Sequence, residues 1–199
     1  MVWDSLWPFA NPPDTTVKSL MHPPESLVTS PASPAGLPGR LSRQPAGQDP
    51  LLAAGWRLRR RVLPQHTDHA GVMWHGAYVG WLEEARVEAL AAVGLAYSDL
   101  AAQGLELPVV ALAIEYRQAL LHGDWVEIRS EVQPRRGLRL PWRSLLLDGA
   151  GVVAAEARVE LVAVQLGPMA GANRQRRLMR RLPPELETAV ASLVAGPSR

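Results

Sequence analysis

Residues 76–94 read GAYVGWLEEARVEALAAVG, and their apolar side chains recur with the period of an α-helix. The repeat has the spacing i, i+4, i+7, i+11 and i+14, and it consists of Tyr78, Leu82, Ala85, Ala89 and Ala92. Gly94 stands where a glycine commonly follows the last turn of a helix. The pattern predicts one long helix over residues 76–93 that is apolar around most of its circumference and therefore largely buried.

Strand-like segments lie on both sides of this helix, one before it and four after it. They are WRLRRRVL (56–63), LPVVALAIEYR (107–117), DWVEIRSEV (124–132), LRLPWRSLLL (138–147) and VVAAEARVELVAV (152–164). DGAG at residues 148–151 is typical of a hairpin turn, and Pro141 suggests an edge strand or a bulge. The order predicts an α+β fold in which a five-stranded antiparallel sheet wraps around one long helix.

The last of these strands has the clearest alternation. Its inward residues are Ala155, Ala157, Val159 and Leu161, and its outward residues are Glu156, Arg158 and Glu160. We therefore expect an apolar face towards the helix and a charged face away from it.

The segments outside residues 54–166 differ from this domain in composition. Residues 1–53 hold most of the prolines, mixed with Ser, Gly and Thr and without a period, so we expect this segment to be disordered. Its start has no basic region and no unbroken apolar run, which argues against a secretory signal. Residues 167–199 are expected to form a basic linker, RQRRLMRR at 174–181, and then a short helix at LPPELETAVASL, 182–193.

Composition excludes several kinds of protein. Of the 199 residues 47% are hydrophobic, and no stretch reaches the about 18 apolar residues of a membrane span. Cysteine is absent, so disulfides, thiolate catalysis and cysteine-bound zinc are excluded, and we expect a cytoplasmic location. The net charge is only +2, and the basic run at 174–181 has no interleaved aromatic residues, so no nucleic-acid partner is expected.

Residues 65–78, QHTDHAGVMWHGAY, concentrate polar chemistry just before the helix. His66, Asp68, His69 and His75 offer metal ligands, but His69 points away from the others in a strand-like stretch and no second ligand cluster follows. We therefore expect no metal site. Asp68 within TDHAG is also explained as a turn former. The remaining hypothesis is that Asp68 is a catalytic carboxylate facing a substrate.

The start of the helix favours the catalytic hypothesis. The first N–H groups of a helix have no intrahelical partner and lie at the positive end of its dipole. The backbone N–H groups of His75 and Gly76 are therefore expected to polarise a substrate carbonyl, as an oxyanion hole does. Glycine at Gly71 and Gly76 permits close approach of a ligand to the backbone.

This stretch resembles the hotdog-fold acyl-CoA thioesterases of the 4-hydroxybenzoyl-CoA thioesterase type. Their motif is Asp-x-Asp-x-x-Gly, two hydrophobic residues, an aromatic residue, Tyr or His, two more residues and Tyr, followed by a helix with an acidic-Ala-Arg patch. The matching positions here are Asp68, Gly71, Val72, Met73, Trp74, His75, Tyr78 and EEAR at 83–86. Strand and helix order over residues 56–164 also fits. His66 and His69 depart from the motif and leave the substrate preference open.

The resemblance implies a thioester hydrolase without a cofactor, in which Asp68 acts as nucleophile or as general base for water. It also implies that the thioester carbonyl lies on the backbone N–H groups at the helix start. The substrate-binding residues that it implies are Gly71, Val72, Trp74 and Tyr78. Arg135 and Arg136, in the turn PRRGLR, are expected to hold the phosphates of CoA.

Three alternatives for the function stay open. The substrate could be an aromatic thioester such as 1,4-dihydroxy-2-naphthoyl-CoA, or a thioester of acyl carrier protein. Outside the enzymes, the alternative is a non-catalytic hotdog scaffold whose Pro-rich segment recruits partners. An isolated hotdog sheet leaves one edge and half of a substrate tunnel exposed, so a homodimer or homotetramer is expected.

Overall fold

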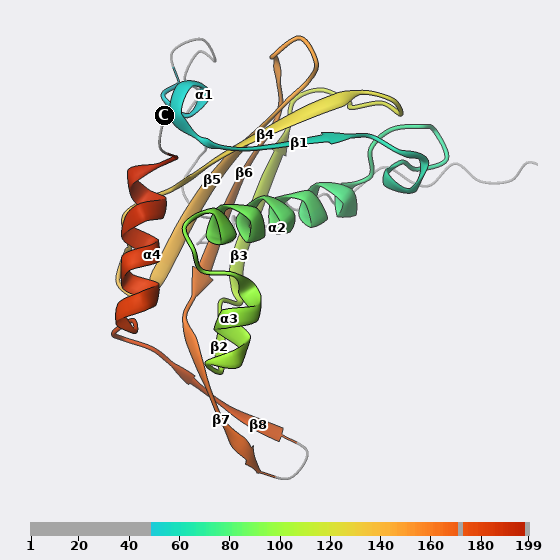
Figure 1. The fold of residues 1–199 in the computed structure, drawn as a ribbon. Helices are drawn as coiled ribbons and strands as arrows, with labels where there is room; N and C mark the ends of the chain where they lie inside the picture. Colours follow the sequence, from blue (N-terminus) through green and yellow to red (C-terminus); the bar gives the residue numbers. More distant parts are fainter. Residues whose placement is uncertain (1–48, 171–172, 198–199) are drawn as a thin grey trace, which may run out of the picture. The chain divides into compact units, whose positions relative to one another are not determined.

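The computed structural model describes residues 49–170 and 173–197. The expected disorder of residues 1–53 therefore falls mostly outside the described residues. Within them, a long helix lies against a twisted antiparallel sheet, and a smaller sheet lies beyond the C-terminal end of that helix (Figure 1).

The main sheet has five strands in the order β1-β4-β5-β6-β3, and every neighbouring pair is antiparallel. The strands are β1 (Trp56–Arg61), β3 (Val109–Tyr116), β4 (Trp125–Val132), β5 (Arg139–Leu147) and β6 (Val153–Val162). They lie within the predicted segments, because apolar alternation marks the residues that a sheet buries. The predicted hairpin turn joins β5 to β6, where the Asp148 N–H donates to Val152 O at 2.9 Å.

Helix α2 (His75–Ala92) supplies the other side of the core. The predicted stripe is buried at Tyr78, Leu82, Ala85 and Ala89. Its last member, Ala92, is exposed, because the helix ends there and Gly94 turns the chain with a φ of 80°. The first three members of the stripe pack on Leu58, Val126, Ile128 and Leu146 of the sheet.

Strand β5 is not an edge strand, so that interpretation of Pro141 is wrong. β5 lies between β4 and β6. Pro141 is tolerated because β4 has ended at Val132, which pairs with Trp142. The Pro141 carbonyl accepts from the Gln133 N–H at 2.9 Å, so the missing donor faces a loop rather than a strand.

The structure contains a second sheet that the sequence pattern does not predict. It has three strands in the order β2-β7-β8, which are β2 (Leu105–Glu106), β7 (Val164–Ala170) and β8 (Asn173–Leu178). The short helix α3 (Tyr97–Ala102) connects α2 to β2. The prediction of a linker from residue 167 is therefore wrong up to Leu178. Arginines occupy both faces of β8, and this hides the alternation that marks most strands.

The predicted C-terminal helix is present as α4 (Pro184–Ala195), with proline at its start. It buries Leu186, Ala189 and Leu193 against the domain, and the indole N–H of Trp56 donates to Leu193 O at 3.1 Å. No helix among the described residues is long and apolar enough to cross a bilayer.

The face of the main sheet away from α2 carries buried charges. Glu156 points outward as predicted, but only 1% of its surface is exposed. It accepts from Arg143 Nε at 2.8 Å and from Arg117 Nη2 at 2.5 Å. Arg143 also donates to both carboxylate oxygens of Asp49, at 3.0 and 2.5 Å.

This ionic cluster moves the boundary of the domain. The predicted start at residue 54 is wrong, because Asp49 and Leu51 are buried. Leu51 begins the short helix α1 (Leu51–Ala54) and packs on the outward-facing Leu145, Leu147 and Val153. The sequence pattern does not mark this boundary, since a single carboxylate and a single leucine make the contacts.

Candidate active site

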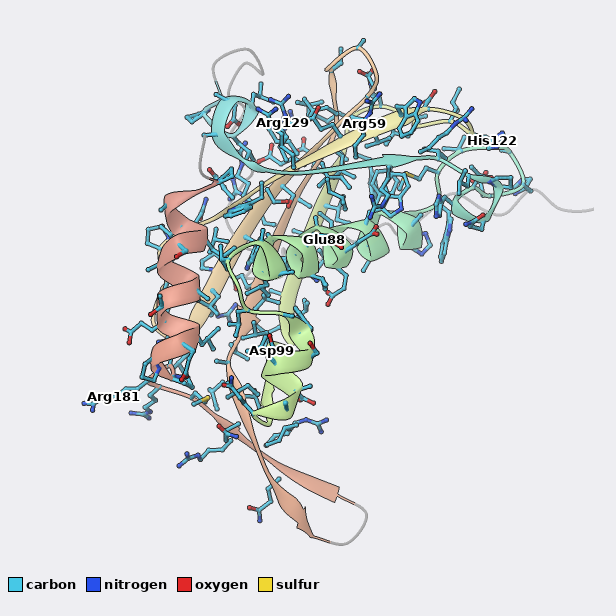
Figure 2. All side chains as sticks on the ribbon, viewed as in Figure 1. Arg59, Glu88, Asp99, His122, Arg129 and Arg181 are labelled. Carbon is cyan, nitrogen blue, oxygen red and sulfur yellow. The ribbon has the colours of Figure 1, made fainter. Side chains whose placement is uncertain are left out.

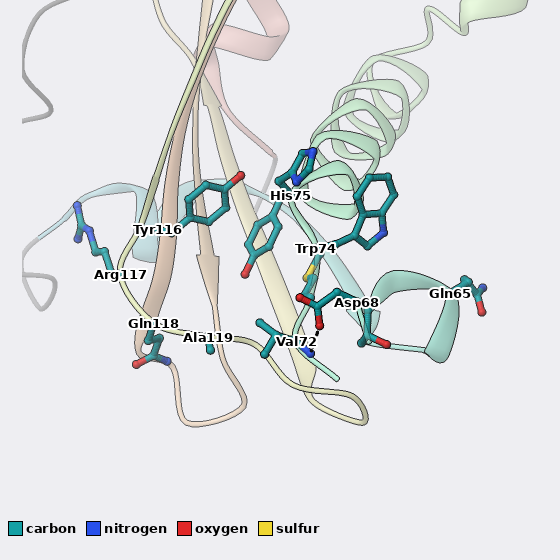
Figure 3. Close-up of a pocket in the computed structure, with 12 residues that line it drawn as sticks. Gln65, Asp68, Val72, Trp74, His75, Tyr116, Arg117, Gln118 and Ala119 are labelled. Carbon is teal, nitrogen blue, oxygen red and sulfur yellow. Dashed lines mark hydrogen bonds between the residues drawn. The ribbon is translucent and has the colours of Figure 1, made fainter. Parts of the chain in front are cut away.

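A pocket of about 880 Å³ opens beside the N-terminal end of α2 (Figure 3). Its lining comes from the loop before α2, the first turn of α2 and the end of β3, and it comprises Gln65, Thr67, Asp68, Val72, Met73, Trp74, His75, Tyr78, Tyr116, Arg117, Gln118 and Ala119. A pocket of this size accepts a small-molecule ligand. It brings together five of the predicted site residues, Asp68, Val72, Trp74, His75 and Tyr78.

Asp68 is held in a tight turn before α2. Its backbone N–H donates to Val72 O at 2.9 Å, and the Gly71 N–H donates to Asp68 O at 3.1 Å. The carboxylate Oδ1 accepts from the N–H groups of Ala70 and Val72, at 2.8 and 3.2 Å. Gly71 has a φ of 76°, which glycine adopts far more readily than other residues. This backbone conformation explains why a glycine stands here, since Gly71 does not line the pocket. Within residues 49–170 and 173–197, Asp68 Oδ2 has no hydrogen-bond partner and is available to the pocket.

The turn at Asp148 repeats this arrangement. DHAGV at 68–72 and DGAGV at 148–152 make the same backbone hydrogen bonds, and Asp148 Oδ1 accepts from the N–H groups of Ala150 and Val152 at 2.9 and 2.8 Å. Asp148 Oδ2 accepts from Gln118 Nε2 at 2.7 Å. The backbone donor at Val152 and the Gln118 amide hold the pKa of Asp148 below its usual value. Asp68 therefore does form a turn, and the turn uses only one of its two carboxylate oxygens, Oδ1.

The start of α2 faces the same pocket. The cap residue Trp74 makes no side-chain hydrogen bond to the helix. The N–H groups of His75 and Gly76 therefore keep the unpaired donors of a first helical turn. The Trp74 ring lies across Gly76, where an added Cβ would come within 2.1 Å of it. Gly76 does not line the pocket itself, and its glycine is explained by this close approach of the indole.

Two tyrosines form an aromatic wall of the pocket. Tyr78 of α2 and Tyr116 of β3 meet edge to face, with ring centroids 4.9 Å apart. Burial raises the pKa of Tyr78 to about 12, so its hydroxyl is a hydrogen-bond donor at neutral pH. Tyr116 and Gln118 cannot be predicted from the sequence, because no local motif relates the end of β3 to a loop some fifty residues earlier.

The histidines of the loop have structural contacts. His66 Nδ1 accepts from the Leu63 N–H at 3.1 Å, and its ring meets Trp81 edge to face at 5.1 Å. His75 meets the Trp74 ring at 5.2 Å. Among the residues that the structure describes, no three His, Asp or Glu side chains converge as a metal site would require.

The two arginines predicted to hold phosphate have different surroundings, and neither lines the pocket beside α2. Arg135 Nη2 donates to the carbonyl oxygens of Met179 and Arg180, at 3.2 and 3.1 Å. Arg136 is exposed and borders a separate pocket of about 360 Å³ beside β3, β5 and β6, which Arg158 and Glu160 also line. Arg135 is thus engaged with the backbone, whereas Arg136 is accessible.

Comparison with known proteins identifies the family. The model of the thioesterase-like superfamily matches residues 62–190. This chain belongs to the thioesterase-like superfamily. The Synechocystis protein sll0410, provisionally named an esterase, is 38% identical over 134 residues, which are 67% of this chain and 76% of that protein. The acyl-CoA thioester hydrolase YbgC of Escherichia coli is 30% identical over 104 residues, 52% of this chain and 78% of that protein.

Solved structures agree with this membership. Protein TT1821 of Thermus thermophilus has a TM-score of 0.59 at 28% identity, and the match covers 69% of this chain and 98% of that one. A 1,4-dihydroxy-2-naphthoyl-CoA (DHNA-CoA) thioesterase of Staphylococcus aureus has a TM-score of 0.60 at 23% identity, covering 70% and 90%. The α+β thioesterase fold and the predicted enzyme class, a thioester hydrolase, are confirmed.

Proposed function

We propose that this thioesterase-like protein hydrolyses acyl-CoA, with the Asp68 carboxylate and the N–H groups of His75 and Gly76 as catalytic groups. The observation that carries the proposal is that Asp68 and the first residue of α2 line one pocket. The relatives YbgC of E. coli and of Haemophilus influenzae, both named for acyl-CoA, support the substrate class. Membership of the 4-hydroxybenzoyl-CoA type is part of the same proposal.

The chemistry needs one ionised oxygen and two backbone donors. With Oδ1 held by the turn, Asp68 Oδ2 either attacks the thioester carbonyl carbon or removes a proton from the water that attacks it. The His75 and Gly76 N–H groups stabilise the negative charge that develops on the carbonyl oxygen. In the first route CoA leaves as its thiol and water then hydrolyses the acyl–Asp68 anhydride. Both routes end in a free acid and CoA.

The aromatic wall favours an aromatic acyl group as the second candidate substrate. Tyr78 and Tyr116 line the pocket with their rings in edge-to-face contact, and Trp74, which also lines it, is 44% exposed. Aromatic rings pack well in such surroundings. A thioester such as DHNA-CoA, for which the S. aureus structure is named, fits this lining. Acyl carrier protein thioesters and a scaffold role remain the other candidates.

We expect the active form to be a cytoplasmic homodimer or homotetramer. Strand β3 is an edge of the main sheet, and it exposes Val109, Val110, Leu112 and Tyr116 by 41% to 50%. An apolar edge strand of this kind invites pairing with a second chain. Because Tyr116 also lines the pocket, pairing along β3 would add residues of a partner subunit to the site. Arg136 would contact CoA phosphates from such a neighbouring subunit.

A panel of thioesters tests the proposal. The full-length protein is assayed by free-thiol detection with straight-chain acyl-CoA, aromatic acyl-CoA, and the same acyl groups on pantetheine and on acyl carrier protein. We expect hydrolysis of at least one acyl-CoA. Its kcat/KM should be at least about 10-fold above that of the same acyl group on the carrier protein, the factor expected from one arginine that binds a CoA phosphate through two hydrogen bonds. Preference for the carrier protein would reverse the substrate assignment. Release of no thiol from any compound would favour the scaffold.

A further inference from the structure

Three arginines close together near the C-terminus share the same lack of a charged partner among the described residues. Within residues 49–170 and 173–197, Arg177, Arg180 and Arg181 form no ion pair and donate no side-chain hydrogen bond. Their neighbour Arg176 pairs with Glu106 at 3.2 Å. The first two acidic residues of α4 lie close in sequence but make no pair with them. The three charges are therefore unneutralised within the described chain.

The backbone that carries these arginines is fixed in place. Met179 N–H donates to Ala163 O at 2.9 Å, and Leu178 pairs with Val164 of β7. Arg135 donates to the carbonyl oxygens of Met179 and Arg180 from the β4–β5 turn. Because the Arg135 guanidinium binds neutral carbonyl oxygens and not a carboxylate in these contacts, it adds a fourth positive charge beside the three arginines.

These residues form one exposed surface, which we call the arginine surface and define by Arg177, Leu178, Arg180 and Arg181. With Met179 they line a concavity of about 350 Å³. All three arginines are exposed, and Leu178 is 46% exposed between them. Arg181 points away from the domain at the end of β8 that leads into α4 (Figure 2). An exposed leucine among unpaired arginines offers both apolar and cationic contacts.

The arginine surface does not serve the CoA bound in the same subunit. The candidate active site lies at the N-terminal end of α2, whereas β7 and β8 join β2 beyond its C-terminal end (Figure 1). α2 has 18 residues, which separate its two ends by about 27 Å. The ligand of the arginine surface is therefore not the CoA bound in the same subunit.

We propose that the arginine surface docks the protein on an anionic phospholipid membrane. Arginine matches phosphate through its planar fork, and the exposed Leu178 suits the boundary between headgroups and acyl chains. Nucleic acid is less suited, because residues 164–181 contain no aromatic side chain on which a base could stack. The role is peripheral, and it goes beyond the proposed hydrolysis of acyl-CoA.

Vesicle sedimentation tests the proposal with the full-length protein. The wild type is expected to sediment with phosphatidylglycerol vesicles but not with phosphatidylcholine vesicles, and to be released by about 0.5 M NaCl, where charge interactions are screened. Each basic residue near such a surface strengthens binding about five-fold. The variant R177A/R180A/R181A should therefore bind about 100-fold more weakly, while its hydrolysis of a water-soluble acyl-CoA stays unchanged.

A matched variant separates this surface from net charge. R57A/R59A/R61A removes the same number of arginines from β1 and should bind phosphatidylglycerol vesicles like the wild type. Equal losses in the two variants would overturn the proposal, as would equal binding of the wild type to neutral vesicles. Wild-type protein that binds duplex DNA or RNA but no vesicle, measured by fluorescence anisotropy, would also overturn it. None of these results depends on whether the protein hydrolyses acyl-CoA.

Discussion

Asp49 shows how one residue ties the start of the described chain to the sheet. It is 7% exposed, and its carboxylate accepts two hydrogen bonds from Arg143 and one from the Leu51 N–H. The Arg143 guanidinium holds the pKa of Asp49 below its ordinary value of 3.8, and burial opposes this only in part. Removing the carboxylate leaves Arg143 with Glu156 at 2.8 Å and Glu131 at 3.7 Å as its carboxylate partners.

The variant Asp49→Asn is expected to lower the free energy of unfolding by about 2 kcal/mol at pH 7, the usual contribution of hydrogen bonds to a charged group, because Arg143 keeps Glu156 as a partner. The stabilisation by Asp49 is present above pH 3.8 and is lost as the pH falls through the lower pKa of the folded state. Urea unfolding at pH 7 and in acid below pH 3.8 measures both effects. If the free energies of unfolding of the variant and the wild type differed by the same amount at both pH values, the result would contradict a stabilising ion pair.

The sequence predicts part of the site at the residue scale. Asp68 lies in the pocket before α2, and an Asp and a Gly next to a helical repeat are visible in a linear motif, whereas its catalytic role stays a prediction. Glu156 was assigned to the outward face but not to a buried one. Its partners Arg117 and Arg143 come from two other segments, and Asp49, the second close partner of Arg143, comes from a third. No local pattern reports such contacts.

At the scale of elements, the β4–β5 turn connects to the segment between β8 and α4. Arg135 was predicted to bind phosphate but donates to two carbonyl oxygens of that segment. β8 itself was missed for a related reason, since its strand character comes from pairing with β7 rather than from buried side chains. The main sheet and α2 bury apolar faces and could be predicted.

Single variants separate the roles of the two turn arginines. Arg135→Ala should speed amide hydrogen exchange over residues 177–182 without changing KM for acyl-CoA. Arg136→Ala should raise KM for acyl-CoA about 10-fold and leave kcat nearly unchanged, as expected for lost contacts to a phosphate. The KM for acyl-pantetheine, which lacks the nucleotide, is the control and should not change. A raised KM for acyl-CoA in Arg135→Ala, or faster exchange over residues 177–182 in Arg136→Ala, would contradict these roles.

At the scale of the whole molecule, the edge strand β3 makes the expected assembly testable. Leu112 is 41% exposed on β3, and a lysine there should prevent pairing between two chains. We expect the wild type to sediment as a homodimer or homotetramer in analytical ultracentrifugation and Leu112→Lys as a smaller species. The matched control is Val152→Lys, in the β5–β6 turn, where the side chain is 51% exposed. A wild-type monomer, or equal effects of both variants, would contradict assembly along β3.

The central claim is that Asp68 is a catalytic carboxylate and not only a turn former, and the most direct measurement compares Asp68→Asn with Asp148→Asn. In both variants the asparagine oxygen can accept the two backbone N–H groups that Oδ1 accepts now. In Asp148→Asn the Gln118 side chain, which now donates to Oδ2, can turn so that its amide oxygen accepts from the new amide. Both variants should therefore keep the wild-type melting temperature and oligomeric state. Asp68→Asn should lower kcat for acyl-CoA by about 10²- to 10⁴-fold, the usual effect of losing a general base, and Asp148→Asn should leave it within about two-fold. A folded Asp68→Asn variant that hydrolyses acyl-CoA at the rate of Asp148→Asn would contradict the catalytic role.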